Sequence, residues 1–179
     1  MRTRYALITM ASVLILVIGL PVGSVTGSVA DARTRPACTI TGTHRDDRLR
    51  GTTGPDVICA LRGEDRVYGR GGDDVIYGGL GRDHLLGQAG DDRVYGGGMD
   101  DGLRGNRGDD QLFGQRGRDD LDEIYGADLL VGGHGHDWMY AEDGTANDRL
   151  LGGPARDYGW ADPGDVVRSL LLDGDPPCC

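Results

Sequence analysis

A nine-residue repeat dominates this chain. Residues 69–95 read GRGGDDVIY, GGLGRDHLL and GQAGDDRVY, with Asp at the sixth place of each unit and an aliphatic residue at the eighth. In steps of nine, the Asp column runs unbroken from Asp47 to Asp137, and the aliphatic column from Leu49 to Met139. A two-residue shift after Met139 precedes two weaker units, which brings the count to about thirteen. A fixed period of this length predicts a solenoid, in which each repeat packs on its neighbours.

The repeats resemble the G-G-x-G-x-D-x-U-x nonapeptide of the repeats-in-toxin (RTX, haemolysin-type) calcium-binding proteins, over residues 42–160. The resemblance implies an all-β fold, a right-handed parallel β-roll (β-solenoid) of about thirteen nonapeptide repeats, two per coil. It also implies that the first six residues of each repeat form a turn that binds Ca²⁺ and that the last three form a short strand. Proteins of this family usually carry a toxin or catalytic domain beside the repeats, and here the repeats and their flanks account for the whole sequence.

The residue types suit calcium. Ca²⁺ takes six to eight oxygen ligands, and tight turns supply backbone carbonyls, with Gly at the first and fourth places expected to allow positive φ. Asp at the sixth place adds a carboxylate. Because strands alternate between two sheets, turns two repeats apart are expected to stack about 4.8 Å from each other.

The stacked turns predict two edges with different calcium sites. One edge is expected to hold an uninterrupted row of ions, with these ligands: Asp56, Asp74, Asp92, Asp110 and Asp128, and the fourth-place glycines Gly54, Gly72, Gly90 and Gly108. On the other edge, the better sites are expected at two Asp pairs and one glycine: Asp65 with Asp83, Asp119 with Asp137, and Gly81.

Three substitutions interrupt the pattern. Arg45 and Met99 replace fourth-place glycines, so sites that touch Asp47 or Asp101 are expected to be weaker or empty. Glu123 replaces the opening glycine of its repeat, which weakens the case for the site next to Asp110. The alternative for the whole column is that Asp only caps turns through hydrogen bonds to the backbone.

The composition predicts a fold that depends on the ion. With 33 Gly and a single Phe, the chain has few large side chains for a core. One buried aliphatic side chain per repeat does not offset the entropy cost of ordering nine residues. We therefore expect the calcium-free chain to be largely disordered and calcium binding to be the folding step.

The outward-facing places differ between the two sheets. With the eighth place inward, the seventh and ninth face solvent, which gives one sheet an apolar face with Tyr77, Tyr95 and Phe113 and the other a mixed, charged face. Cross-strand pairing that steadies the sheet is the favoured interpretation of the aromatic residues. The alternative is a surface for a protein or glycan partner, or for self-association.

The two ends of the chain have their own signals. Residues 1–32 are predicted to be a signal peptide, because Arg2 and Arg4 precede an apolar run that ends before Ala30-Asp31-Ala32. The run is too short and too early to be preferred as a membrane span, and whether it is cleaved stays open. Residues 33–41 and 161–179 are predicted to be the N-terminal and C-terminal caps of the roll.

The four cysteines fit an oxidising compartment. A bridge between Cys38 and Cys59 would staple the N-terminal cap. Cys178 and Cys179 are adjacent, so free or intermolecular pairing is an alternative there, and the connectivity is left open.

The net charge and the absence of catalytic motifs restrict the functions that this sequence can have. The formal net charge is −10, which argues against nucleic acid and against stable membrane insertion at an anionic surface. The sequence has no nucleophile elbow, HExxH or phosphate loop, and His134 and His136 occupy variable places of an ordinary repeat. We expect a secreted, extracellular calcium-binding protein without catalysis. The alternatives are an adhesion or protein-interaction module with structural calcium, and a non-catalytic subunit of a secreted enzyme.

Overall fold

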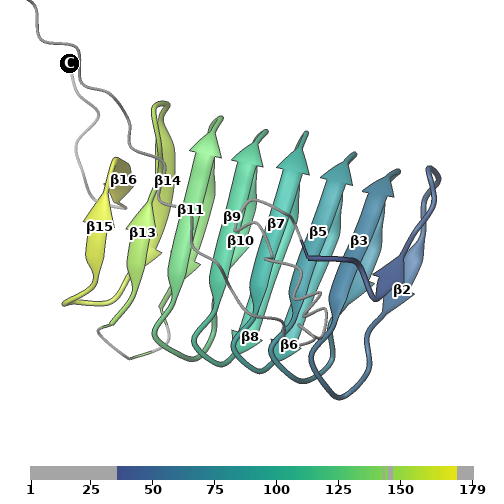
Figure 1. Ribbon diagram of the computed structural model, residues 1–179. Helices are drawn as coiled ribbons and strands as arrows, with labels where there is room; N and C mark the ends of the chain where they lie inside the picture. The colour runs from purple at the N-terminus through teal and green to yellow at the C-terminus, as the bar shows by residue number, and fades with distance from the viewer. Residues whose placement is uncertain (1–35, 143, 145–146, 173–179) are drawn as a thin grey trace, which may run out of the picture. The chain divides into compact units, whose positions relative to one another are not determined.

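The computed structural model describes residues 36–142, 144 and 147–172, which form sixteen β-strands and no helix. Successive strands alternate between two eight-stranded sheets, so every second strand lies side by side in one sheet (Figure 1). The all-β parallel β-roll expected from the repeat is therefore confirmed. The predicted signal peptide, Cys178 and Cys179 lie outside the described residues.

Each sheet contains the strands of every second repeat. The first sheet consists of β1 (Ile40–Thr41), β3 (Val57–Arg62), β5 (Val75–Leu80), β7 (Arg93–Gly98), β9 (Gln111–Arg116), β11 (Leu129–His134), β13 (Arg149–Leu151) and β15 (Val166–Arg168). The second consists of β2 (Arg48–Arg50), β4 (Arg66–Tyr68), β6 (His84–Ala89), β8 (Gly102–Arg107), β10 (Asp120–Asp122), β12 (Trp138–Ala141), β14 (Asp157–Ala161) and β16 (Leu170–Leu172). Among these residues there is no helix of the length and apolarity needed to cross a membrane.

The register follows the period of the sequence. Ile76 on β5 aligns with Ile58 on β3 and Val94 on β7, so residues eighteen apart are neighbours. The predicted slip is also present, because Trp138 on β12 aligns with Tyr158 on β14.

Many strands are longer than the three residues expected. Seven of them contain six residues, because pairing continues into the next repeat, as where Gly79 aligns with Gly97 and Leu80 with Gly98. The backbone of the glycine-rich half is thus hydrogen-bonded along the stack as well.

The aliphatic column forms the core between the two sheets. The side chains at the eighth place are almost completely buried, and the core contains Ile58, Val67, Ile76, Leu85, Val94, Leu103, Leu112, Leu121, Leu130, Met139 and Leu150. The column thins at the ends, where Leu49 is only partly buried.

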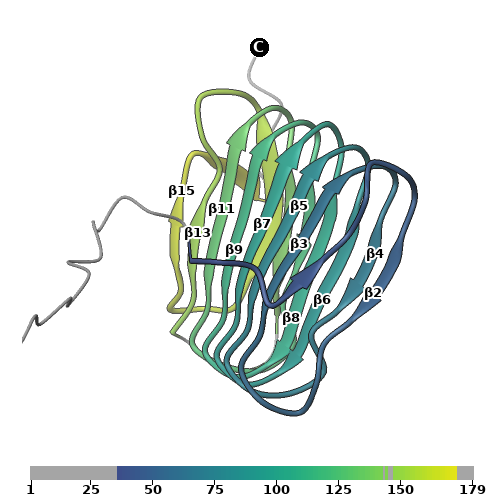
Figure 2. The same ribbon diagram turned by 45° about the vertical axis from the view of Figure 1, so that its right-hand side comes forward.

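Strand pairing continues beyond the thirteen repeats counted from the sequence. β1 pairs with β3 at the N-terminal end, and β15 and β16 pair with β13 and β14 at the other end. Cys38 and Cys59 form a disulfide with a Cα–Cα distance of 5.9 Å, which ties the segment before β1 to β3. Figure 2 shows this end of the stack, with β2 and β4 in the second sheet and β3 and β5 in the first.

The aromatic residues of the first sheet stack on one another. The ring centroids of Tyr77 and Tyr95 lie 5.0 Å apart, and those of Tyr95 and Phe113 lie 4.9 Å apart. All three side chains are half-buried. The rings therefore make the cross-strand contacts that the favoured interpretation requires.

Replacing one core aliphatic residue should destabilise the roll. Leu112 is completely buried, so Leu112→Ala should lower the free energy of unfolding of the calcium-loaded protein by about 2–5 kcal/mol. Leu80 is 55% exposed, and Leu80→Ala should change it by less than about 0.5 kcal/mol. Urea denaturation followed by circular dichroism measures both. Equal effects of the two substitutions would contradict the assignment of the core.

Candidate metal centre

Two rows of buried aspartates follow the edges of the roll. Each sixth-place Asp lies at the start of a strand, directly before it or, for Asp157, as its first residue, so the alternation of strands sends successive aspartates to different rows. From Asp65 onward these side chains are at most 3% exposed. The first row contains Asp56, Asp74, Asp92, Asp110, Asp128 and Asp148, and the second contains Asp47, Asp65, Asp83, Asp101, Asp119, Asp137 and Asp157.

From Asp65 onward, one oxygen of each carboxylate accepts a hydrogen bond from the coil before it. The Asp74 N–H donates to Asp92 Oδ1 at 2.8 Å, and the Asp92 N–H donates to Asp110 Oδ1 at 2.7 Å. The same bond links each member of the second row, as from Asp65 to Asp83 at 2.9 Å. Oδ1 is therefore an acceptor between coils rather than a cap within its own turn.

The other carboxylate oxygen is buried without a partner in most repeats. Within the described part of the chain, Oδ2 has no hydrogen-bond partner in nine residues: Asp65, Asp74, Asp83, Asp92, Asp101, Asp110, Asp119, Asp137 and Asp157. Leaving a buried charged oxygen unpaired is costly. These atoms require a proton or a cation beside them.

The first two repeats are different because Oδ2 caps their turns. Asp47 Oδ2 accepts the N–H of Thr43 at 2.6 Å, and Asp56 Oδ2 accepts the N–H of Thr52 at 2.7 Å. The hydroxyls of both threonines also donate to these oxygens. The turn-capping alternative thus describes these two aspartates, whereas glycine-rich turns elsewhere provide no such hydroxyl.

The opening glycine of each repeat leaves the space into which Oδ2 points. A Cβ at Gly69 would overlap both Asp74 Oδ2 and the carbonyl oxygen of Gly87 in the next coil. The same arrangement surrounds Gly78 and Gly114. A carboxylate oxygen and a carbonyl oxygen thus converge on a position that only glycine keeps open, and both are ligands that Ca²⁺ prefers.

Positive φ occurs at the fourth and second places, not at the first and fourth as expected. The fourth-place glycines Gly72, Gly81, Gly90 and Gly108 have positive φ, but Gly54 does not, because its turn contains Pro55 and is capped by Thr52. The opening glycines have no positive φ, so their role is to leave room.

The left-handed conformation at the second place was not predicted, because the residue there varies. Arg70, Gln88 and Asn106 adopt φ of 87°, 90° and 85°, although side chains with a Cβ rarely do so. Pairing with the neighbouring coils holds them in it, as where Gln88 aligns with Asn106.

Met99 keeps the backbone of the glycine that it replaces. Its φ is 81°, and its carbonyl oxygen lies close to Gly117 in the next coil, like the carbonyls of fourth-place glycines. Asp101 Oδ2 is buried and unpartnered like its neighbours. The geometry of the backbone therefore does not set Asp101 apart from the rest of its row.

A model of the RTX calcium-binding nonapeptide repeat matches the chain in four copies, over residues 41–76, 68–103, 95–122 and 125–146. These residues make up more than half of the chain. The chain belongs to this RTX repeat family. No curated protein matches it significantly.

One coil departs from the RTX pattern by adding a carboxylate. Glu123 occupies an opening-glycine place, and its side chain lies with those of Asp110 and Asp128, with one ligand atom of each residue within 4.8 Å of the others. Its carboxylate accepts the N–H of Gly105 at 2.8 Å and of Asn106 at 3.0 Å. The sequence indicated a defect here because Glu lacks the freedom of Gly, whereas the structure places a third buried acid beside the row.

A second acidic row, at the fifth place, was treated as variable in the sequence. Asp73 Oδ1 accepts the N–H of Asp91, and Asp91 Oδ1 accepts that of Asp109, at 3.1 and 3.0 Å. These exposed carboxylates bond to the coil after them, opposite in direction to the sixth-place row. The repetition of Asp-Asp in these three repeats was the signal that could have identified them.

Burial raises the pKa of eight sixth-place aspartates between Asp65 and Asp137, whereas hydrogen bonds from Thr52 lower the pKa of Asp56. The largest cause is desolvation, while the N–H of the preceding Asp opposes it and neighbouring carboxylates add to it. The pKa is raised to about 6 for Asp74, Asp83 and Asp137, to about 7 for Asp92, Asp110 and Asp119, and to about 8 for Asp101. Burial likewise raises the pKa of Glu123 to about 9. Near neutral pH the cation-free rows thus hold protons that a bound cation would displace.

Filling the space beside Oδ2 should disturb one turn selectively. Gly69→Ala puts a methyl group against Asp74 Oδ2 and the Gly87 carbonyl, so it should destabilise the roll by about 1–3 kcal/mol. Gly71 lies in the same turn with ordinary contacts only, so Gly71→Ala serves as the control. Calcium titrations and urea denaturation compare the two variants. If Gly71→Ala lowered stability and calcium affinity as much as Gly69→Ala, the opening glycine would not be the residue that keeps the space beside Oδ2 open.

In the absence of calcium, raising the pH should unfold the roll. The folded pKa of Asp92 is about 7 against an ordinary 3.8, so between these values the folded chain binds more protons than the unfolded chain. Each such carboxyl group therefore loses its stabilising contribution as pH rises from 3.8 to its folded pKa, which is about 6 for Asp74 and about 8 for Asp101. Circular dichroism in chelator should show more β-structure near pH 5 than near pH 8. A signal that grows toward pH 8 would contradict this sign.

Proposed function

We propose that this chain is a secreted RTX protein that folds when several calcium ions bind along its two aspartate rows. The observation that carries the proposal is the repeated unpartnered Oδ2, buried beside a backbone carbonyl in coil after coil. A divalent cation supplies the positive charge that this arrangement lacks. Because the rows form only when coils stack, binding energy becomes folding energy.

The structure supports particular residues as the proposed calcium ligands. The sixth-place carboxylates provide charge, and carbonyls of opening and fourth-place glycines provide neutral oxygens. The proposed set keeps Asp65, Asp74, Asp83, Asp92, Asp110, Asp119, Asp128 and Asp137, with Gly72, Gly81, Gly90 and Gly108 at their turns, and adds Glu123. Asp56 and Gly54 are weaker candidates, because Thr52 already occupies Asp56 Oδ2.

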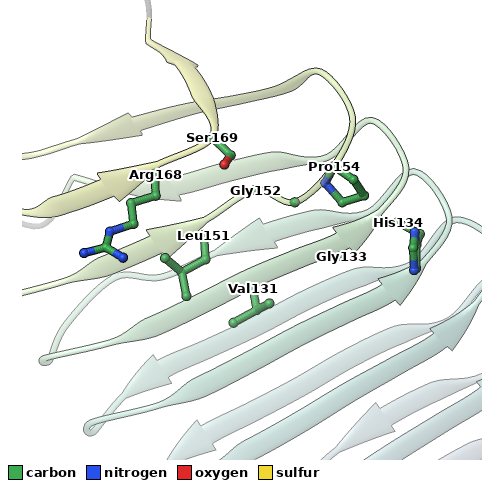
Figure 3. A pocket seen from close by; sticks show the side chains of 9 residues that line it. Val131, Gly133, His134, Leu151, Gly152, Pro154, Arg168 and Ser169 are labelled. Carbon is green, nitrogen blue, oxygen red and sulfur yellow. The ribbon is translucent and has the colours of Figure 1, made fainter.

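A non-catalytic role is part of the proposal. A pocket of about 330 Å³ on the first sheet contains a His, a Ser and an Arg. Figure 3 shows His134 at one end of it, with Arg168 and Ser169 at the other. Covalent catalysis pairs a nucleophile with a base by a hydrogen bond, and in the described part of the chain no hydrogen bond between the side chains of His134 and Ser169 is found.

Secretion has indirect support. The Cys38–Cys59 disulfide fits an oxidising compartment, and calcium outside cells is abundant enough to fill weak sites.

The alternative of a protein or glycan partner on the Tyr77, Tyr95 and Phe113 face stays a proposal of lower rank, because those rings already stack on one another.

The test is a calcium titration of residues 33–179 followed by far-ultraviolet circular dichroism. A transition from coil to β-structure is expected with Ca²⁺ but not with equal Mg²⁺, which demands a strict octahedral site. Asp92→Asn should raise the calcium midpoint on the order of tenfold, because calcium affinity depends on ligand charge. Glu142→Gln removes the same charge from an exposed side chain that perturbs none of the proposed ligands, and it should leave the midpoint unchanged. A chain fully folded in chelator at neutral pH would refute calcium-driven folding.

A further inference from the structure

The coil that contains Glu123 departs from the regular backbone pairing of the second sheet. On one side β8 pairs with β6 as far as Arg107. On the other side β8 pairs with β10 only as far as Asp122, and pairing resumes at one bridge between Arg107 and Tyr125. The ladder is therefore interrupted at Glu123, which occupies the place of an opening glycine.

The Glu123 carboxylate accepts the hydrogen bonds of the interrupted ladder. In a regular coil the N–H group at the second place donates to a backbone carbonyl of the next coil, as from Arg70 to Gly87 at 3.1 Å. At the same place Asn106 donates to Glu123 Oε2 at 3.0 Å, and Gly105 before it donates to Oε1 at 2.8 Å. A carboxylate is thus inserted between two stacked coils in place of peptide carbonyls.

Glu123 Oε1 lies beside the unpartnered oxygen of Asp110. A Cβ at Gly105 would overlap both Asp110 Oδ2 and Glu123 Oε1, whereas at Gly69 and Gly78 the second atom is the carbonyl oxygen of the opening glycine in the next coil. Asp110 is 1% exposed, and its Oδ2 is buried without a hydrogen-bond partner. A charged oxygen therefore takes the place that a neutral oxygen has in regular coils.

Three carboxylates meet in this coil. One ligand atom each of Asp110, Glu123 and Asp128 lies within 4.8 Å of the others, and all three residues are at most 4% exposed. In the described part of the chain, no other group of three acidic, His or Cys side chains lies this close together. Among the same residues, no Arg or His forms an ion pair with Asp110 or Glu123. Glu123 thus adds a third negative group to two successive members of the first row.

The ligand types select a hard cation. The cluster offers no imidazole or thiolate, which are the ligands that favour transition metals, and Mg²⁺ usually keeps several waters rather than entering an all-protein cage. Calcium affinity increases with the charge and the rigidity of the ligands. Both oxygens of Glu123 are held by backbone N–H groups. The exchange of a neutral oxygen for a fixed carboxylate therefore favours tighter calcium binding here than in a regular coil.

We propose that the cluster of Asp110, Glu123 and Asp128 is the first calcium site to fill, ahead of the regular sites of both rows. The inference rests on the proposed function, since two of its three ligands belong to the first row. Because Asp110 and Glu123 lie in successive coils, an ion between them joins these coils before the rest of the roll has stacked. The loss of regular pairing at Glu123 agrees with a specialised site, because departures from a local sequence rule are expected where function requires them.

Equilibrium dialysis of residues 33–179 against radiolabelled Ca²⁺ tests the order of filling. A single ion per chain is expected to bind at a free calcium concentration at least about tenfold below that of the others, because of the additional ligand charge. Glu123→Gln keeps the size of the side chain and removes its charge, so this ion should bind at least about tenfold more weakly. Glu142→Gln removes the same charge from an exposed side chain and should retain the tight ion.

A second variant keeps the test decisive if Glu123→Gln does not fold. Glu123→Gly restores the opening glycine of the repeat, so it should fold as a regular coil and yet lack the tight ion. Loss of this ion in a folded Glu123 variant, with its retention in Glu142→Gln, would support the proposal. A parent chain without a separate tight ion would overturn it. So would a Glu123→Gly variant that keeps the tight ion or gains one, since Glu123 would then block the site instead of completing it.

Circular dichroism of every dialysed sample keeps this test apart from the proposed function. If the parent chain is folded in chelator, calcium-driven folding is refuted, but dialysis still shows whether a tight ion is present and depends on Glu123. If the parent chain folds with calcium and binds all its ions at one concentration, the inference about the first site alone is refuted.

Discussion

The roll depends on one interaction repeated from coil to coil, the bond between an aspartate carboxylate and the backbone N–H of the aspartate before it. Asp92 Oδ1 accepts from Asp74, and Asp92 itself donates to Asp110. This bond satisfies a buried backbone group at every turn, yet it draws a carboxylate into the interior and leaves its second oxygen without a partner. The same contact that stacks the coils thus creates the need for a cation.

Most of the fold could be predicted because its determinants are local and periodic. The eighth-place aliphatic column fixes which face is buried, and the register of eighteen residues follows from two repeats per coil. What could not be predicted is the pairing beyond the recognisable repeats. Val166 and Val167 on β15 extend the first sheet directly after Asp165, whose carboxylate accepts the N–H of Asp148. This Asp–aliphatic pair lies eight rather than nine residues after Asp157, so it falls outside the period counted from the sequence.

The site was predictable in its composition and less so in its geometry. The identity and order of the buried aspartates follow from the period, but the roles of the glycines do not. Whether a glycine provides space, as at Gly69, or positive φ, as at Gly72, depends on where the neighbouring coil lies. Glu123 shows the same limit, since its side chain reaches Asp110, which lies in another coil.

The hydrogen bonds between the sixth-place aspartates all point the same way along the stack, so the two ends of the roll are chemically unequal. Each coil donates its Asp N–H to the coil after it, and the final donor of the first row, Asp148, relies on Asp165 at 3.1 Å. A chain truncated at its C-terminal side would bury a backbone N–H group that has no hydrogen-bond acceptor. One cut at its N-terminal side would lose only a donor to an oxygen that water can reach. The roll therefore has a polarity, like a filament with a growing end, and a coil is complete only when its successor is in place.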